Sequence, residues 1–229
     1  MSGRVSSAAR EDAPPAEGAV RGVFFDFGGV LATEGFREGL AVIARRAGVE
    51  EGPFFEQARD AIYDSAYIVG RGSEHDFWEL VRQRTGLAGA DAALSEECLS
   101  RFALRPGMIG LAREVRARGV LAVILSDQTD WLERMDARWG FSREFDGVIN
   151  SYRVGKSKRD PTLFDDVVRR LGIRPEEAAF VDDDPGNVER AAARGLRAIL
   201  FNGEEAIRSR LEGLLSGGAA KPAAGPQPR

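Results

Sequence analysis

The sequence has 229 residues, few soft metal ligands and no long apolar run. A single cysteine, Cys98, excludes a disulfide within the chain, and one cysteine with one histidine, His75, excludes Cys/His zinc sites. The longest apolar run, 120–125, is far shorter than the roughly 18 residues of a membrane-spanning helix. No apolar secretory segment follows Met1. These absences predict a cytoplasmic protein without a membrane partner, and any metal must have oxygen ligands.

Two further functional classes are disfavoured by charge and motif content. The formal net charge of −4 argues against nucleic acid as a partner. No Walker A loop or dinucleotide-binding fingerprint is present, and the nearest match, Gly70-Arg71-Gly72, precedes no strand-to-helix turn of the expected kind. The sequence leaves the oligomeric state open.

The two ends of the chain differ in composition from the rest. Residues 1–19 contain only Met1 and Val5 as large apolar side chains, and residues 216–229 contain none. Such segments bury too little apolar surface to offset the entropy lost on ordering. We therefore expect two disordered tails.

Between the tails, apolar runs typical of buried strands alternate with helical patterns. The expected strands are 20–27, 120–125, 146–151, 178–181 and 196–201, and the expected core helices are 107–118, 129–139, 161–171 and 186–194. This alternation indicates βαβ units and predicts an α/β fold with a doubly wound parallel sheet. We expect residues 20–32 and 106–215 to form this core.

Residues 33–105 interrupt the alternation and form the expected inserted, all-helical cap domain. Their periodicity predicts helices at 36–47, 53–67, 74–84 and 94–102. Ser73 followed by Asp76 has the spacing of a capping box, which favours a helix start at that point.

Polar side chains follow the ends of four expected core segments. Asp26 ends the first strand, Ser126 and Asp127 follow the second, Lys158 lies after the third, and Asp182–Asp184 follow the fourth. Ligands of open parallel sheets bind beyond the carboxyl ends of the strands. Carboxylates without histidine suit Mg²⁺, and a lysine and a hydroxyl suit phosphate. An acid at a single strand end is explained by a turn or a helix cap. Polar residues of these types after four segments, in this order, favour a phosphate site.

At these positions the chain resembles the haloacid-dehalogenase-like (HAD) hydrolase superfamily, in the subgroup with a helical cap after the first motif. The matching segments are 24–31 (FFDFGGVL), 125–127 (LSD), Lys158 within 155–164, 180–187 (FVDDDPGN) and 105–108 (RPGM). The resemblance covers residues 20–215. Residues 158–161 read Lys-Arg-Asp-Pro where the family usually has Lys-Pro-Asp-Pro.

The resemblance implies a Mg²⁺-dependent phosphomonoester hydrolase that acts on a small phosphorylated substrate through an aspartyl-phosphate. Asp26 is the implied nucleophile, and Ser126 and Lys158 are the other implied catalytic residues. The implied phosphate-binding residues are Gly28, Ser126, Asp127 and Lys158, and the implied metal ligands are Asp26, Gly28 through its carbonyl, Asp182 and Asp183.

One residue departs from the phosphatase pattern. Phosphatases of this family usually carry a second aspartate two residues after the nucleophile, where this chain has Gly28. That aspartate is a general acid and base, a role worth about 10²–10⁴ in rate. Glu34 and Asp127 are candidate replacements.

Gly28 keeps other functions open. The main alternative is a catalytically weak or silent phosphate-binding or regulatory protein. A 2-haloacid dehalogenase also lacks the second aspartate, but it needs no metal and leaves Asp182–Asp184 unexplained. A response-regulator receiver domain phosphorylates an aspartate at a strand end, but it has no place for the helical insert.

Overall fold

The computed structural model describes residues 18–216 and contains a five-stranded sheet. The strands are β1 (Gly22–Phe25), β2 (Leu121–Ser126), β3 (Gly147–Asn150), β4 (Ala178–Asp182) and β5 (Arg197–Leu200). The helices are α1 (Gly35–Ala47), α2 (Glu51–Asp64), α3 (Glu74–Thr85), α4 (Asp91–Leu99), α5 (Pro106–Ala117), α6 (Trp131–Trp139), α7 (Ser151–Val154), α8 (Thr162–Leu171), α9 (Pro185–Ala193) and α10 (Glu204–Ser216). Three short 3₁₀ turns, Tyr67–Val69, Phe141–Glu144 and Pro175–Glu177, complete the described elements.

All four strand pairings are parallel, in the order β3-β2-β1-β4-β5. The chain moves outward from β1 in one direction and then returns to build the other half of the sheet. This is the doubly wound arrangement predicted from the sequence, and it places a topological switch point between the carboxyl ends of β1 and β4.

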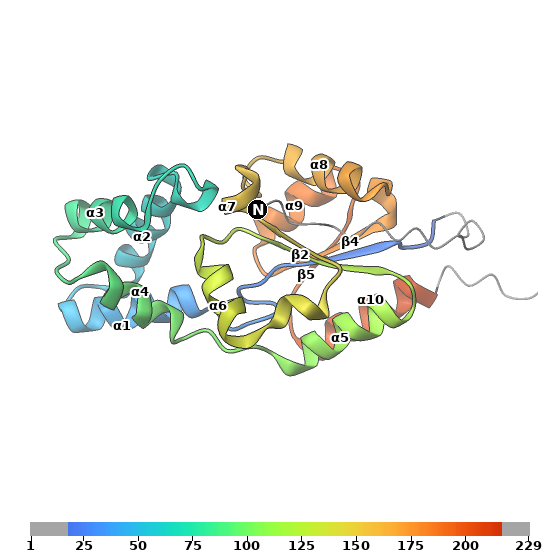
Figure 1. Cartoon of the computed structure of the whole chain (residues 1–229), viewed down its shortest axis with the longest axis horizontal. Helices are drawn as coiled ribbons and strands as arrows, with labels where there is room; N and C mark the ends of the chain where they lie inside the picture. Colours follow the sequence, from blue (N-terminus) through green and yellow to red (C-terminus); the bar gives the residue numbers. More distant parts are fainter. Residues whose placement is uncertain (1–17, 217–229) are drawn as a thin grey trace, which may run out of the picture.

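Alternate side chains of β1 point to opposite faces of the sheet. Val23 and Phe25 join one apolar cluster with residues of α5, α6 and α10, whereas Phe24 joins a second cluster with residues of α8 and α9. Figure 1 shows α8 and α9 on one side of the sheet and α5 and α10 on the other. Burial on both faces explains why the strands are continuously apolar.

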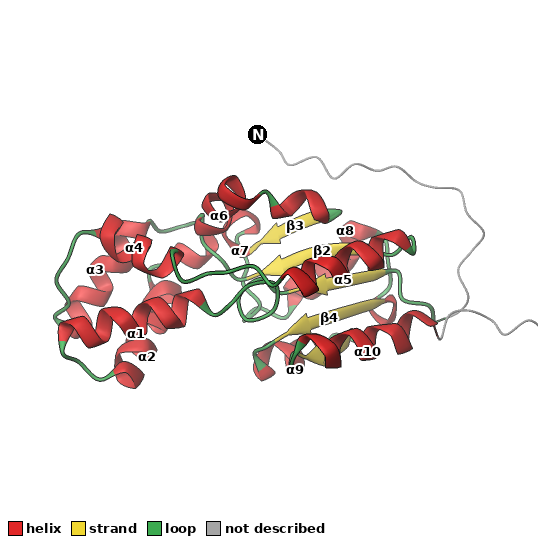
Figure 2. Ribbon diagram, turned by 90° about the horizontal axis from the view of Figure 1, so that it is seen from below, coloured by secondary structure: helices red, strands yellow, loops and turns green. Residues whose placement is uncertain are grey.

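Helices α1–α4 lie beyond one end of the sheet, where the arrowheads of β2, β3 and β4 point (Figure 2). The apolar cluster of α5, α6 and α10 continues into these helices, so the helical insert packs on the core instead of standing apart. The predicted capping box is present: Asp76 N–H donates to Ser73 Oγ at 3.1 Å, and Ser73 N–H donates to Asp76 Oδ2 at 2.8 Å.

The insert departs from the predicted helices in two places. The helix expected at 53–67 starts earlier and ends at Asp64, because Ala66 adopts a left-handed conformation (φ 56°) that breaks it before the 3₁₀ turn Tyr67–Val69. The helix expected at 94–102 spans Asp91–Leu99 instead, and Phe102 is buried beyond its end. Hydrophobic period alone does not locate such ends.

Two core helices were not predicted. Helix α7 begins at Ser151, which the sequence assigned to the third strand, and Asn150 caps it by accepting from Tyr152 N–H at 3.2 Å. Helix α10 follows β5 and buries only Ile207 and Leu211 against the core, which gives a weak periodic signal.

The predicted tails, 1–19 and 216–229, fall almost wholly outside the described residues. We propose, as the sequence predicts, that residues 20–32 and 106–215 form one structural unit, the core, and that residues 33–105 form a second unit, the cap. None of the helices within 18–216 is long and apolar enough to cross a membrane.

Candidate active site

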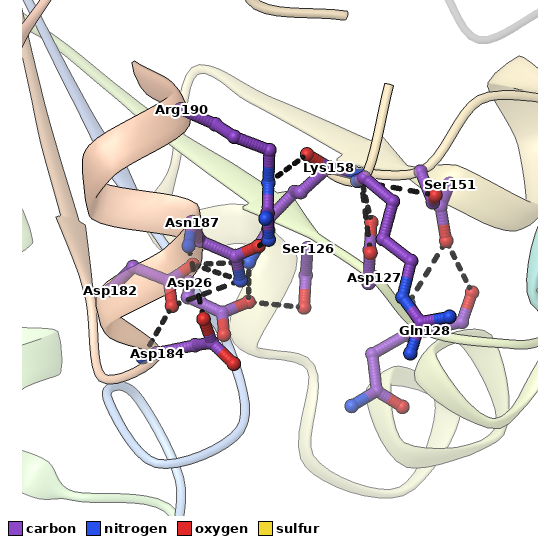
Figure 3. Close-up of polar contacts among 12 residues, drawn as sticks. Asp26, Ser126, Asp127, Gln128, Ser151, Lys158, Asp182, Asp184, Asn187 and Arg190 are labelled. Carbon is purple, nitrogen blue, oxygen red and sulfur yellow. Dashed lines mark hydrogen bonds and ion pairs between the residues drawn. The ribbon is translucent and has the colours of Figure 1, made fainter. Parts of the chain in front are cut away.

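The residues singled out at the strand ends converge at the carboxyl edge of the sheet, on the side that faces α1–α4. Figure 3 shows Asp26, Ser126, Lys158 and Asp182 pointing toward one another. They come from β1, β2, the loop before α8, and β4, so parallel pairing of the strands is what brings them together.

Asp26 is held by two donors and is mostly buried, with 9% of its surface exposed. Ser126 Oγ donates to Asp26 Oδ1 at 2.6 Å, and Lys158 Nζ lies 2.7 Å from the same oxygen. Burial, opposed by the positive charge of Lys158, raises the pKa of Asp26 to about 7. The other oxygen of Asp26 has no protein donor among the described contacts.

Lys158 is buried and links two acids. Its Nζ donates to Asp182 Oδ2 at 2.6 Å while also contacting Asp26. The charges of Asp182 and Asp26 overcome the effect of burial and raise the pKa of Lys158, so it is an ammonium at neutral pH.

Asp182 is fully buried, and its carboxylate is oriented by the loop that follows β4. Asn187 Nδ2 lies 3.2 Å from each carboxylate oxygen, and Asp184 N–H donates to Oδ1 at 2.8 Å. Asp184 itself caps α9 by accepting from Asn187 N–H at 3.0 Å. In this acidic triplet, Asp184 has a structural role at the helix start.

Three acids at this edge form a cluster with the spacing of a cation site. One carboxylate oxygen from each of Asp26, Asp182 and Asp183 lies within 4.8 Å of the other two. Mg²⁺ bonds of about 2.1 Å separate ligand oxygens by roughly 3–4 Å, so small adjustments would fit the ion. Burial and the negative charges of Glu34 and Asp182 raise the pKa of Asp183 to about 7. The donor set therefore fits a hard divalent cation.

Glu34 also belongs to this cluster. Its carboxyl shares a hydrogen bond with Asp183, and burial together with the charge of Asp26 raises its pKa. The two acids approach each other over Gly29, where a Cβ would collide with Asp183 Oδ2 and lie 2.7 Å from Glu34 Oε1. Gly29 has φ +75°, so glycine is required there by both space and backbone conformation.

Gly28 leaves room for a Cβ in ordinary contact with its neighbours, at the position where the second aspartate of the phosphatase pattern would begin. A Cβ at this position would lie 3.5 Å from Glu34 Oε1 and 3.6 Å from Gln128 Nε2. Glu34 therefore brings a carboxylate from the start of the insert to the place that Gly28 leaves unfilled.

Asp127 is engaged differently from the other acids. Its two oxygens accept from Lys158 N–H at 2.9 and 3.1 Å, and Tyr63 Oη donates to Oδ2 at 3.1 Å. The Arg159 guanidinium stacks on the Tyr63 ring, 3.4 Å from its centroid. Asp127 thus ties the Lys158 loop to helix α2.

A cavity of about 150 Å³ lies over Asp26, between the sheet edge and the insert. Asp26, Gly28, Asp127 and Gln128 line it from the core. Phe36, Arg59, Ile62 and Tyr63 line it from α1 and α2.

Sequence reasoning missed several of these contacts. Tyr63 and Asp127 are 64 residues apart, and no local pattern links them. Arg190 was also missed: its Nε donates to the Lys158 carbonyl at 2.9 Å and its Nη2 to Asn187 Oδ1 at 2.7 Å. Its spacing of three from Asn187 on α9 was the one available signal.

The family model for haloacid dehalogenase-like hydrolases matches residues 20–195. The chain therefore belongs to the haloacid dehalogenase-like hydrolase family, as its motifs indicated.

Curated proteins that are similar to this chain include one from Mus musculus and one from Thermus thermophilus. Acyl-CoA dehydrogenase family member 10 of Mus musculus is 26% identical over 208 residues, covering 85% of this chain and 19% of that protein. Phosphoserine phosphatase of Thermus thermophilus is 35% identical over 101 residues, covering 43% of this chain and 41% of that enzyme. The chain thus spans less than half of the length of both relatives.

Solved structures share the fold. A HAD family enzyme from Bacteroides thetaiotaomicron is 20% identical with a TM-score of 0.66, covering 82% of this chain and 98% of that one. A complex of the same enzyme with magnesium and inorganic phosphate is 19% identical with a TM-score of 0.57, covering 80% and 94%. A dehalogenase structure, also 19% identical, has a TM-score of 0.60 and covers 80% and 85%. The fold is common to the HAD family enzyme and the dehalogenase.

Proposed function

We propose that the protein is a Mg²⁺-dependent phosphomonoester hydrolase that acts on a small phosphorylated metabolite. The observation that carries this proposal is the joint placement of the Asp26 carboxylate, the Ser126 hydroxyl and the Lys158 ammonium beside the Asp182–Asp183 pair. A nucleophile, a neutral donor, a cation and further acids at one cavity match the needs of phosphoryl transfer. Similarity to a phosphoserine phosphatase from Thermus and to a Bacteroides enzyme bound to magnesium and phosphate also supports this proposal.

In this proposal Asp26 attacks phosphorus and displaces the alcohol, which leaves an aspartyl-phosphate for water to hydrolyse. Ser126 Oγ and Lys158 Nζ, which contact Asp26 in the free protein, turn to the equatorial phosphoryl oxygens as charge develops on them. Any phosphate contact from residue 127 comes from its N–H, because both carboxylate oxygens of Asp127 already accept hydrogen bonds from Lys158 N–H or Tyr63 Oη.

Asp26, Asp182 and Asp183 would hold Mg²⁺, with the Gly28 carbonyl as the fourth proposed protein ligand. Bound there, the ion would neutralise charge on the transferring group. Lys158 and Asn187 keep Asp182 oriented for this role.

Glu34 is the favoured replacement for the missing general acid and base. Its carboxylate borders the space above Gly28 and lines the cavity, whereas the Asp127 carboxylate is occupied by three hydrogen bonds. We expect Glu34→Gln to slow benzyl phosphate hydrolysis about 10²-fold and 4-nitrophenyl phosphate hydrolysis much less, since nitrophenolate leaves without a proton. Asp127→Asn is the comparison variant, and equal rates in Glu34→Gln and the unaltered protein would remove the idea.

The decisive test is release of inorganic phosphate from 4-nitrophenyl phosphate. We expect turnover with Mg²⁺, loss of turnover with EDTA and recovery on adding Mg²⁺ back. Asp26→Asn serves as the blank because it keeps the shape of the side chain but removes the nucleophile. Turnover that survives in Asp26→Asn would contradict the proposal.

Gly28 supports one second candidate, a phosphate-binding or regulatory protein with little catalysis. This alternative predicts no turnover by the unaltered protein, together with retained Mg²⁺ or phosphate binding in calorimetry. Release of halide from a 2-haloacid, insensitive to EDTA, would instead indicate a dehalogenase.

A further inference from the structure

The cavity over Asp26 has two chemically different ends. Near the nucleophile it is polar, with Glu34 and Gln128 beside Gly28. The other apolar lining residues are Phe36, Ile62 and Ile68 of the insert and Trp131 of α6, and Phe102 lies beside Gly28, 3.9 Å from a Cβ placed there. A leaving group attached to the reacting phosphorus would therefore lie against apolar and mostly aromatic walls.

The polar atoms of the aromatic walls are already used elsewhere. Trp131 Nε1 donates to Glu74 Oε1 at 2.8 Å, and Tyr63 Oη donates to Asp127 at 3.1 Å. These two donors are therefore not free for a ligand, and the Trp131 ring itself has only 1% of its surface exposed. Phe36 is only partly buried and lies 6.2 Å from Trp131 between ring centroids, so the two rings form part of one aromatic wall.

A sugar or polyol would bind weakly against such walls. Each hydroxyl that loses water without gaining a partner costs binding energy. The volume of about 150 Å³ is also comparable to a cavity that holds one benzene ring.

Arg59 of α2 is the single cationic side chain among the described residues that line the cavity. It is about half exposed and pairs with Glu56, while its Nε lies 3.9 Å from Asp60 Oδ1. Ion pairs as exposed as these contribute little to stability, so a ligand carboxylate can replace Glu56 at small cost.

We propose that the substrate is a phosphomonoester whose alcohol carries one aromatic ring and a carboxylate, the ring lying against Phe36 and the carboxylate pairing with Arg59. This inference rests on the proposed phosphatase function. It assigns specificity to α1 and α2, at residues that none of the catalytic motifs contains.

The test compares three competitors that are all esters of primary alcohols: glycerol 3-phosphate, benzyl phosphate and 4-carboxybenzyl phosphate. Their inhibition constants are measured against hydrolysis of 4-nitrophenyl phosphate, so slow turnover of a competitor does not affect the result. We expect benzyl phosphate to bind about tenfold more tightly than glycerol 3-phosphate because its ring is buried. The added carboxylate should give about another tenfold through Arg59.

Arg59→Gln should abolish the second increment and change benzyl phosphate binding less than about twofold. Arg45→Gln is the matched control, because Arg45 is an ion-paired arginine on α1 outside the cavity lining. Glycerol 3-phosphate binding as tightly as benzyl phosphate would overturn the substrate class. Equal weakening of both aromatic competitors by Arg59→Gln would overturn the role of Arg59. Absence of 4-nitrophenyl phosphate hydrolysis would instead refute the proposed function.

Discussion

The arrangement of acids in the candidate site depends on the charge of one buried residue and on the small size of another. Lys158, with 1% of its side chain exposed, lies between the Asp26 and Asp182 carboxylates, and Gly29 leaves room for Asp183 and Glu34. A buried cation between two acids, and a glycine beneath two others, allow four carboxyl groups to gather at one strand edge.

Lys158→Met is expected to destabilise the protein by about 3–5 kcal/mol when metal is removed with EDTA, because two buried carboxylates lose their counter-charge. The free energy of unfolding in urea measures the effect. Lys156→Met is the control, since Lys156 forms an exposed ion pair with Asp166 and should cost under about 1 kcal/mol. Similar losses in the two variants would contradict this account of Lys158.

Gly29→Ala is expected to cost about 1–3 kcal/mol, because the positive φ and the collision with Asp183 act together. Gly110→Ala on α5 is the matched control. Nothing lies within 4 Å of a Cβ there, and alanine should stabilise the helix by up to about 1 kcal/mol. Thermal unfolding of both variants distinguishes them. A Gly29→Ala variant as stable as the unaltered protein would show that the site can relax to accommodate the Cβ.

At the scale of elements, the helical insert is joined by polar contacts between its own helices as well as by its apolar core. His75 of α3 lies 2.8 Å from Asp91 Oδ2 at the start of α4, through its Nδ1. The hydrogen bond and charge of Asp91 raise the pKa of His75, while hydrogen bonds from Arg82 and then His75, opposed by burial, lower the pKa of Asp91.

This pair predicts a pH dependence. Because the pKa of His75 is raised on folding, its contribution is fully present below the unfolded value of about 6.5 and is lost as pH rises through the folded value. Between pH 5.5 and 8.5 the unaltered protein should lose more of its melting temperature than His75→Gln does. The difference is small because the imidazole is exposed, and identical pH profiles would show that the pair contributes nothing.

At the scale of the whole molecule, the insert is fastened to the core around the cavity. Glu74 of α3 accepts from Trp131 Nε1 at 2.8 Å and from Arg134 Nη1 at 3.0 Å, both on α6. Tyr67 donates to Asp130, and Ser151 Oγ donates to the Ile68 carbonyl at 2.7 Å. These contacts join the insert to the core beside the cavity.

Removal of the contacts between the insert and the core should let the insert open while the sheet stays folded. Glu74→Ala is expected to speed amide hydrogen exchange in α2 and α3, with β2 and β4 unchanged, because it leaves Trp131 and Arg134 without their acceptor. Glu79→Ala is the control, since Glu79 lies on the same helix and pairs only within the insert, with Arg82 at 3.6 Å. Faster exchange in both variants would place the effect in α3 itself.

Much of this architecture could be predicted from local patterns. Apolar runs flanked by glycine and polar residues located all five strands to within a few residues, and the acids at strand ends located the edge where Asp26, Ser126, Lys158 and Asp182 meet. Helix ends were less predictable. Ala66 breaks α2 through its backbone conformation, and α10 buries too few side chains to show a period.

The sequence by itself determined the fold class and the chemistry gathered at one edge of the sheet, because the alternation of strands with helices and the types of side chain can be identified in short segments. Only the tertiary structure decided that Glu34 borders the space above Gly28, that Tyr63 donates to Asp127, and that Arg59 lines the cavity. These contacts join segments separated by many residues, and their formation depends on how the insert packs on the core. No local period or motif carries that information.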